Sequence, residues 1–197
     1  GLKFKTAIFT NLSHDHLDYH KNYKDYLKSK LYLFEKLLKK DSNIITDIEI
    51  LEYIKIKNIA IRRKLNIETI STNNNKGSLA VISHKYSHDE QSIKIKYKNK
   101  FYTFKTKLIG KIQIKNILMA MLAAEKSGLN FKQIINAIKE IKPVSGRLEE
   151  IGNIKNNSKI LLDYAHTPDA LKTCLQNLKE QFKDKKISIV FGCGGNR

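Results

Sequence analysis

Two polar clusters in this chain each stand between an apolar run and the start of an amphipathic pattern. The runs are Ala7-Ile8-Phe9 and Ile160-Leu161-Leu162, and both have the length and composition of buried strands. The helical periodicity that follows each cluster makes both segments strand–loop–helix units, which are typical of α/β proteins. Ligands bind at this strand-to-helix edge, so the two clusters predict one shared site.

The remaining periodicity predicts an α/β fold in two unequal domains. It indicates a helix over residues 22–40 and mixed strand and helix units over 44–72. Alternating strands are expected over 79–105, followed by two helices over 115–127 and 130–141. The run from Pro143 to Gly146 ends the helical pattern. We therefore expect a first domain over residues 1–145 and a second over 146–197.

The second domain is expected to begin a Rossmann-like fold. Strands near 150–154 and 158–163 precede a helix, and a third strand is expected over Ile187–Phe191. One face of that helix is apolar, with Leu171, Leu175, Leu178 and Phe182. Three strands and one helix are too few to close a doubly wound core, so an exposed apolar edge and face should remain.

The charge and composition limit the possible partners. The net charge is +18, but the basic residues are mostly Lys and are spread along the chain, which favours a solvated basic surface over a nucleic-acid site. No apolar run reaches membrane-spanning length and no leader is recognisable, which indicates a soluble cytoplasmic protein. Cys174 and Cys193 are too few for a disulfide framework or a Cys-based zinc site.

The first polar cluster has the residue types of a metal site. His14, His16, Asp18 and His20 nearly match the His-x-His-x-Asp-His pattern of metallo-hydrolases, but Tyr19 is interposed before the last imidazole. A polar turn that caps the following helix is the simpler alternative.

Lys30 lies on the following helix. It shares a helical face with Leu27 and Leu31, where a bare ammonium is costly to bury. Burial favours the neutral amine, which can add CO₂ to become a carbamate. The alternative is that the side chain extends to solvent.

Taken together, several segments of the chain resemble the Mur ligases, which add amino acids to the UDP-muramoyl peptide of peptidoglycan. The matching segments occur in the order of that family, at residues 10–20, 110–116, 143–149, 163–171 and 192–197. The resemblance implies the later part of a central ATPase domain followed by the start of a Rossmann-like C-terminal domain. It also implies that the family's phosphate loop and UDP-binding domain lie outside this chain, so the segment alone should be inactive.

The resemblance further implies the role of particular residues. Asn116 would contact adenine, Arg147 and Asp163 would contact ATP, and His166 would lie near the transferring phosphate. Mg²⁺ would be held by His16 and by a carbamylated Lys30, fourteen residues further along the chain. Arg197 would bind a carboxylate of the incoming amino acid.

In this family, ATP phosphorylates the carboxylate of the UDP-muramoyl substrate, and an amine then attacks the acyl phosphate. The turn Gly192-Cys193-Gly194-Gly195 is most similar to that of enzymes adding meso-diaminopimelate to UDP-N-acetylmuramoyl-L-alanyl-D-glutamate. Two segments depart from the family, because Ile112-Gln113 replaces a Phe-Asn pair and Thr46-Asp47-Ile48-Glu49 replaces Asn-Ala-Asp-Asp. The partners implied are the two substrates and the missing ligase segments. A non-catalytic remnant, a basic binding module and a metallo-hydrolase are the alternatives.

Overall fold

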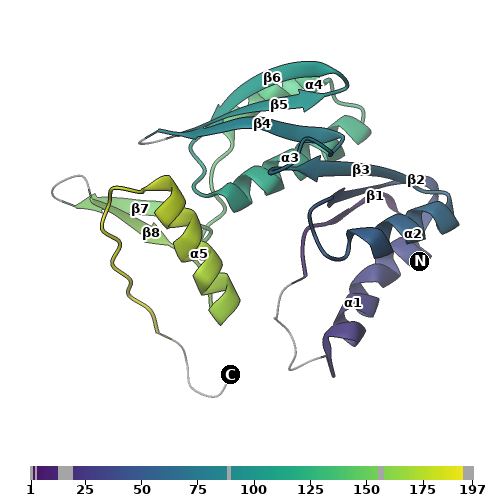
Figure 1. Ribbon diagram of the computed structural model, residues 1–197, viewed down its shortest axis with the longest axis horizontal. Helices are drawn as coiled ribbons and strands as arrows, with labels where there is room; N and C mark the ends of the chain where they lie inside the picture. Colours follow the sequence, from purple (N-terminus) through teal and green to yellow (C-terminus); the bar gives the residue numbers. More distant parts are fainter. Residues whose placement is uncertain (1, 3, 13–19, 88–89, 155–157, 193–197) are drawn as a thin grey trace.

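The chain is built on a six-stranded mixed sheet in the order β1-β2-β3-β4-β5-β6 (Figure 1). The computed structural model describes residues 2, 4–12, 20–87, 90–154 and 158–192. The pairs β1–β2, β2–β3 and β3–β4 are parallel. The pairs β4–β5 and β5–β6 are antiparallel and form a meander. The strand bounds are β1 Phe4–Phe9, β2 Leu38–Asp47, β3 Asn66–Ser71, β4 Leu79–Tyr86, β5 Gln91–Tyr97 and β6 Lys100–Thr106.

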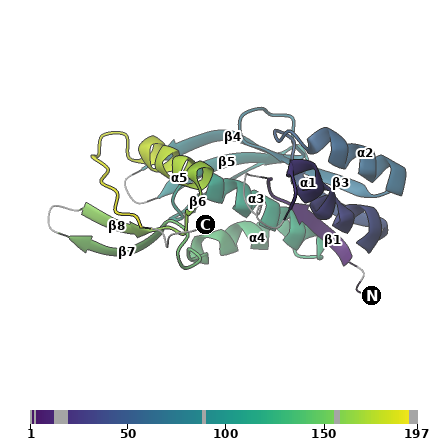
Figure 2. The same cartoon turned by 90° about the horizontal axis from the view of Figure 1, so that it is seen from below.

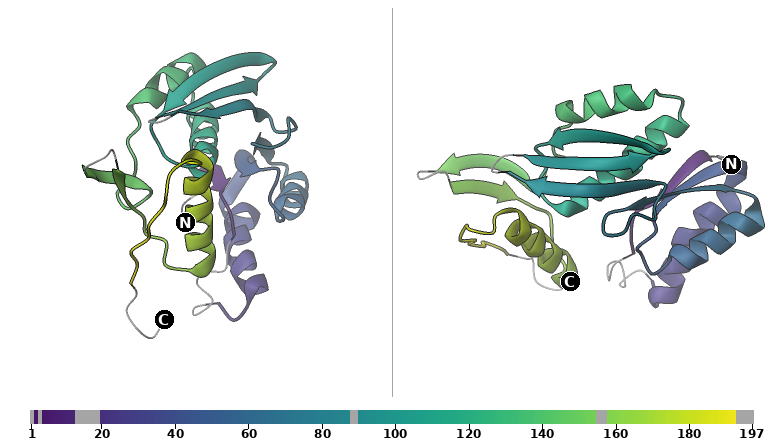
Figure 3. Two further views of the ribbon diagram at one scale, coloured as in Figure 1. Left: turned by 60° about the vertical axis from the view of Figure 1, so that its left-hand side comes forward. Right: turned by 45° about the horizontal axis from the view of Figure 1, so that its top comes forward.

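Helices flank this sheet on both sides (Figure 3). One group comprises α1 (Tyr23–Tyr32), which continues into a π-helical turn at Leu33–Leu37, and α2 (Tyr53–Arg63). The other comprises α3 (Lys111–Lys126) and α4 (Phe131–Ala137), which ends in a 3₁₀ turn at Ile138–Glu140.

Two neighbouring residues of β2 belong to two different cores. Ile44 packs with the apolar residues of β1, α1 and α2, whereas Ile45 packs with those of α3 and of the antiparallel strands. Both side chains are fully buried. Successive side chains of a strand point to opposite faces, so each face of β2 carries its own helical layer.

The boundaries of two predicted helices differ from expectation. The helix expected over 22–40 stops being helical after Leu37, because Leu38 begins β2 and pairs with Phe4 of β1. The helix expected from 115 begins at Lys111. The elements expected over 44–72 and 79–105 are confirmed, as is the end of α3 before Gly128, which has a positive φ of 97°.

The second domain contains an antiparallel pair and one helix. β7 (Glu149–Ile154) pairs with β8 (Ser158–Leu162), and α5 (Pro168–Gln181) follows. Figure 2 shows these elements at one end of the molecule, opposite β1, α1 and α2. Leu148 and Leu178 of this domain form a small core with Ile109, which precedes α3. This contact joins the two domains.

The strand expected over Ile187–Phe191 is wrong. This segment is irregular and carries exposed apolar side chains, including a fully exposed Val190 and a Phe191 that is 76% exposed. A strand forms only where a neighbouring strand accepts its backbone hydrogen bonds, and the segment pairs with none of the described strands. The expected exposed apolar face is confirmed at Ile151, Ile154, Ile160 and Leu162 as well.

None of the helices in the described ranges has both the length and the apolar composition that a membrane span requires.

Candidate functional site

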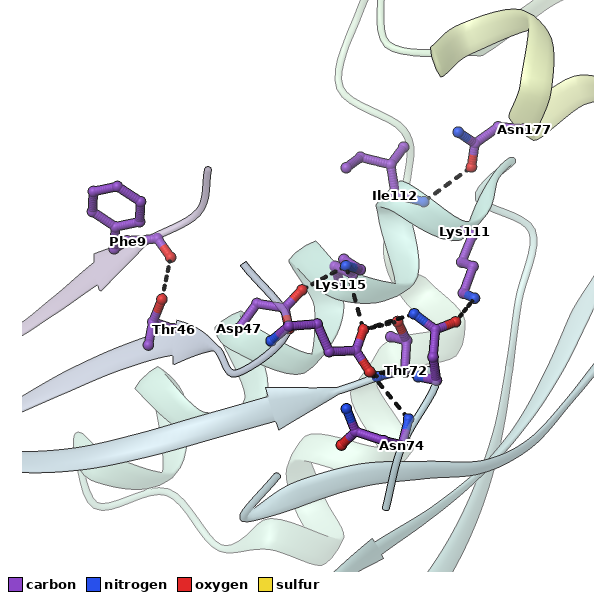
Figure 4. A network of polar contacts seen from close by, with 11 residues as sticks. Phe9, Thr46, Asp47, Thr72, Asn74, Lys111, Ile112, Lys115 and Asn177 are labelled. Carbon is purple, nitrogen blue, oxygen red and sulfur yellow. Dashed lines mark hydrogen bonds and ion pairs between the residues drawn. The ribbon is translucent and has the colours of Figure 1, made fainter. Parts of the chain in front are cut away.

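The carboxyl ends of β1, β2 and β3 meet in one polar network (Figure 4). The Thr46 hydroxyl donates to the backbone carbonyl of Phe9 at 3.1 Å, which ties the end of β2 to the end of β1. Asp47, at the last position of β2, is buried and accepts from the ammonium of Lys115 at 2.5 Å. Lys111, one turn earlier on α3, donates to the side chain of Asn73 beyond β3. Lys111 and Lys115 therefore connect the first turns of α3 to the carboxyl ends of the parallel strands.

Glu49 organises the loop that follows β3. Its Oε1 accepts from the backbone N–H groups of Thr72, Asn73 and Asn74 at 3.1, 2.7 and 3.1 Å. Its Oε2 accepts from the Thr72 hydroxyl and the Asn73 amide, and the ammonium of Lys115 lies 3.7 Å away. Burial opposes the charge of this carboxyl, but hydrogen bonds from Asn73, Thr72 and Asn74 outweigh it and hold the pKa of Glu49 below its usual value.

The low pKa of Glu49 predicts that this loop is acid-sensitive. A carboxyl whose folded pKa lies below the unfolded value of 4.5 contributes its full stability above that pH and loses it as pH falls through the folded pKa. We expect Glu49→Gln to lower the free energy of unfolding by about 1–3 kcal/mol at pH 7. The deficit should shrink below pH 4.5, and urea denaturation between pH 3 and 7 measures it.

Glu35 offers the matched control for that experiment. It pairs with Arg62 at 3.1 Å on the surface, with 39% of its side chain exposed, whereas the Glu49 side chain is 11% exposed. Exposed pairs contribute roughly 0–1 kcal/mol, so Glu35→Gln should change little at any pH. A Glu49→Gln deficit that stayed constant down to pH 3 would contradict the prediction.

A second cluster surrounds Tyr164, directly after β8. Its backbone N–H donates to the carbonyl of Gly146 at 2.8 Å, which closes the loop between the domains. The guanidinium of Arg147 lies 5.5 Å from the centre of the Tyr164 ring, and the His166 ring packs edge-on against it at 5.0 Å. The predicted site residues Arg147 and His166 thus both contact one exposed aromatic ring.

Asp163 holds the backbone beneath this cluster. Its two carboxylate oxygens accept from the N–H groups of Leu148 and Ala165, each at 2.9 Å. Leu148 has a positive φ of 48°, which costs roughly 1–2 kcal/mol for a bulky residue. Burial of its side chain and the hydrogen bond that its N–H donates to Asp163 offset that strain.

Asn116 of the first domain is connected to this cluster through Gln113. The Asn116 amide donates to Gln113 Oε1 at 3.3 Å, and the Gln113 amide donates to the backbone carbonyl of Arg147 at 3.4 Å. Asn116, Arg147, Asp163 and His166 therefore belong to one connected surface built from both domains.

Lys30 occupies a different position, beside the carboxyl end of β1. Its ammonium donates to the carbonyl of Asn11 at 2.8 Å and lies 5.7 and 5.0 Å from the rings of Phe9 and Tyr26. The ring of His20 stacks on Tyr26 at 4.8 Å. Lys30 is partly buried, which lies between the buried position and the solvent-extended alternative. The helical period places Lys30 at the border of the buried face rather than within it.

Two predicted site residues, His16 and Arg197, lie outside the described residues, as do His14, Asp18 and Cys193. Within the described ranges, no group of three or more His, Cys, Asp or Glu side chains is arranged to hold a metal ion. Cys174 lies beside the second cluster, where burial and the charge of Asp163 raise its pKa to about 11. Its thiol therefore stays protonated at neutral pH, which makes it a poor nucleophile.

Lys115, Gln113 and Tyr164 were not singled out from the sequence as site residues, and Gln113 was noted only as a departure from a family pattern. Glu49 was noted only as a departure from a family pattern. Its position just beyond an apolar strand was the available signal, because acceptors there meet the next loop. The contact of Tyr164 with Arg147 depends on how the loop between the domains closes, and no local pattern encodes that.

Comparison with known proteins connects this architecture to one family. Residues 1–124 match the Mur ligase middle domain, and residues 146–197 match the Mur ligase, glutamate ligase domain. The chain is 39% identical to the UDP-N-acetylmuramoyl-L-alanyl-D-glutamate–2,6-diaminopimelate ligase of Rickettsia conorii and 32% identical to that of Rhizobium meliloti. Each match covers all of this chain and 40% of the relative.

Solved structures agree with the sequence matches. A structure of a UDP-N-acetylmuramoyl-L-alanyl-D-glutamate–2,6-diaminopimelate ligase superposes with a TM-score of 0.75 at 26% identity, over 98% of this chain and 39% of the other. The MurF ligase of Thermotoga maritima in complex with ADP has the same fold, with a TM-score of 0.74 at 16% identity over 89% and 39% of the two chains.

The parallel sheet edge, with α5 packed near the start of α3, defines an α/β architecture that the Mur ligase structures share. The chain belongs to the Mur ligase family, whose members are ATP-dependent ligases that join an amino acid to a carboxylic acid. It spans about 40% of the length of the curated relatives that it matches.

Proposed function

We propose that the protein containing this chain is an ATP-dependent ligase that joins meso-diaminopimelate to UDP-N-acetylmuramoyl-L-alanyl-D-glutamate in peptidoglycan synthesis. The observation that carries the proposal is the polar connection from Asn116 through Gln113 to Arg147, which joins nucleotide-contact candidates of two domains in one surface. The names of relatives at 39% and 32% identity support the choice of substrates. We propose the cytoplasm as the compartment, because the reaction consumes ATP.

In this proposal the ATP site lies where residues 1–145 meet residues 146–197. Asn116 contacts the adenine, and the fork of donors on Arg147 contacts the phosphates. Asp163 is an acceptor-only carboxylate that would repel phosphate, so it suits the ribose hydroxyls. His166 lies beside the transferring phosphate, and it shares the Tyr164 ring with Arg147 as a contact.

We further propose that Lys30 carries a carbamate and, with His16, holds Mg²⁺. An ammonium repels a cation, but a carbamate supplies the oxygen ligands that Mg²⁺ prefers. The carbamate nitrogen keeps one N–H, so it can still donate to the Asn11 carbonyl. Bound Mg²⁺ would offset the charge of the phosphates. Arg197 is proposed to bind a carboxylate of the incoming amino acid.

The test is a ligation assay on the full-length protein that contains these residues. With ATP, Mg²⁺ and the UDP-muramoyl dipeptide, we expect phosphate release and a tripeptide product with meso-diaminopimelate, detected by mass spectrometry. Product with lysine in preference to diaminopimelate would overturn the amino-acid assignment. Absence of product with either amino acid would favour a non-catalytic remnant.

Arg147 provides a test of the nucleotide site within the same assay. Arg147→Ala should raise the KM for ATP by about tenfold or more, because a charge-assisted contact to phosphate is lost. Arg62 is the matched control, since it is an exposed arginine of α2 that pairs with the surface residue Glu35, and the same substitution should leave the KM unchanged. Equal KM values in both variants would remove Arg147 from the ATP site.

A further inference from the structure

The N-terminus of α3 has no cap of its own. Its N-cap residue is Gly110, which has no side chain, and the first turn carries no acidic residue. Such an end leaves backbone N–H groups without partners inside the helix. Helices are ordinarily capped by Ser, Thr, Asp or Asn of the same segment.

The second domain supplies the missing acceptors. Asn177 of α5 accepts from the Ile112 N–H at 3.1 Å, and Gln181, one turn later, accepts from the Gly110 N–H at 2.8 Å (Figure 4 shows the first of these). Both side chains are less than 10% exposed although α5 is otherwise largely polar on its surface. Buried amides of this kind are costly unless they are paired, which makes the two bonds specific for one arrangement.

The backbone carbonyl of Gly110 also accepts a hydrogen bond, from a residue of β5 in the first domain. Gln91 of β5 is fully buried, and its amide donates to the carbonyls of Leu108 and Gly110, while its Oε1 lies 2.7 Å from His84 Nε2. The Asn177 side chain is itself fixed, because its amide donates to the Thr173 carbonyl at 2.7 Å. A continuous buried polar chain therefore runs from the antiparallel strands through Gly110 to α5.

We propose that Asn177 and Gln181 are positioning residues that set the orientation of the second domain by capping α3 across the domain boundary. The proposal rests on the proposed function in one respect. Asn116 stands on α3 while Arg147, Asp163 and His166 stand on the second domain, so this cap aligns the two halves of the ATP site. Neither residue is among the proposed nucleotide contacts.

The test uses variants that roughly keep side-chain size and remove the amide, including the acceptor and, at Asn177, the donor to the Thr173 carbonyl. Asn177→Leu and Gln181→Met retain good helix-forming residues in α5, so the helix itself is preserved. Gln181→Glu retains the Oε1 acceptor and is the rescue variant. Gln176→Met is the matched control, because Gln176 is an exposed neighbour on the same helix.

Amide hydrogen exchange on the 197-residue chain reports the cap directly. In the double variant, exchange at Gly110 and Ile112 should accelerate by about tenfold or more relative to the Gln176→Met control. Gln181→Met alone should accelerate Gly110 and leave Ile112 protected, which keeps the test decisive if the double variant does not fold. Unchanged exchange at both amides would overturn the cap.

Kinetics of the full-length ligase test the alignment. The double variant should lower kcat/KM for ATP by about tenfold or more, with the KM for the amino acid unchanged, and Gln181→Glu should behave like the parent protein. Faster exchange with unchanged ATP kinetics would overturn the positioning role. A parent protein that turns over no ATP would refute the proposed function instead, while the exchange result would still decide whether α5 caps α3.

Discussion

Replacing Lys30 by alanine in the full-length ligase should abolish ligation. The proposed carbamate supplies oxygen ligands at this position, and its loss removes a ligand of Mg²⁺ that neutralises phosphate charge. A short carboxylic acid such as acetate or propionate should restore part of the activity by occupying the vacated space. Turnover measured with and without the added acid provides the readout.

The contacts of Lys30 limit the effect of the substitution to one place in the structure. Its ammonium is fixed by the Asn11 carbonyl and two aromatic rings, so the substitution changes one defined place beside the carboxyl end of β1. Lys28 is an exposed lysine on the same helix, and Lys28→Ala should leave turnover unchanged. Full activity of Lys30→Ala without any added acid would disprove the carbamate, as would the absence of a labelled carbamate signal after exposure to ¹³CO₂.

Gly110→Ala should be among the most destabilising single substitutions in the chain. Gly110 has φ 89° and ψ 149°, a region open essentially only to glycine, which costs roughly 1–3 kcal/mol for other residues. An added Cβ would also lie 3.0 Å from Cβ and Oδ1 of Asn177 and 3.1 Å from Leu148. We expect a total loss of about 3 kcal/mol or more in the free energy of unfolding, measured by urea denaturation.

Gly128→Ala separates the two causes of that loss. Gly128 follows α3 with a similar φ of 97°, but a Cβ built there meets no atom within 4 Å. This control should lose only the conformational part, about 1–2 kcal/mol. Equal losses in the two variants would show that Asn177 and Leu148 move aside, and the clash would then contribute nothing.

Local periodicity predicted most of the fold because the elements carry their own signals. The strands of the antiparallel meander alternate in polarity, and α5 begins with Thr167 as its N-cap and Pro168 in its first turn. The start of α3 was misplaced because its cap comes from Asn177, 65 residues further along the chain. The strand expected at Ile187–Phe191 failed because apolar residues form a strand only beside a partner strand.

The candidate site was predictable only in part. Arg147, Asp163 and His166 were expected at one ATP site from the family resemblance. Tyr164 contacts both Arg147 and His166, and Gln113 links Arg147 to Asn116. These contacts arise from the packing of the domains rather than from any local pattern. The roles of His16 and Arg197 stay predictions.

Ile44 and Ile45 pack into different cores on opposite faces of β2, and this constrains how the sequence can change over evolutionary time. Either isoleucine can be exchanged for leucine or valine with a modest loss of packing, which suits a chain so rich in isoleucine. A single-residue insertion or deletion within β2 is a different matter, since it would turn every following side chain to the opposite layer. It would also carry Thr46 and Asp47 away from Phe9 and Lys115. The length of β2 is therefore constrained more tightly than its composition.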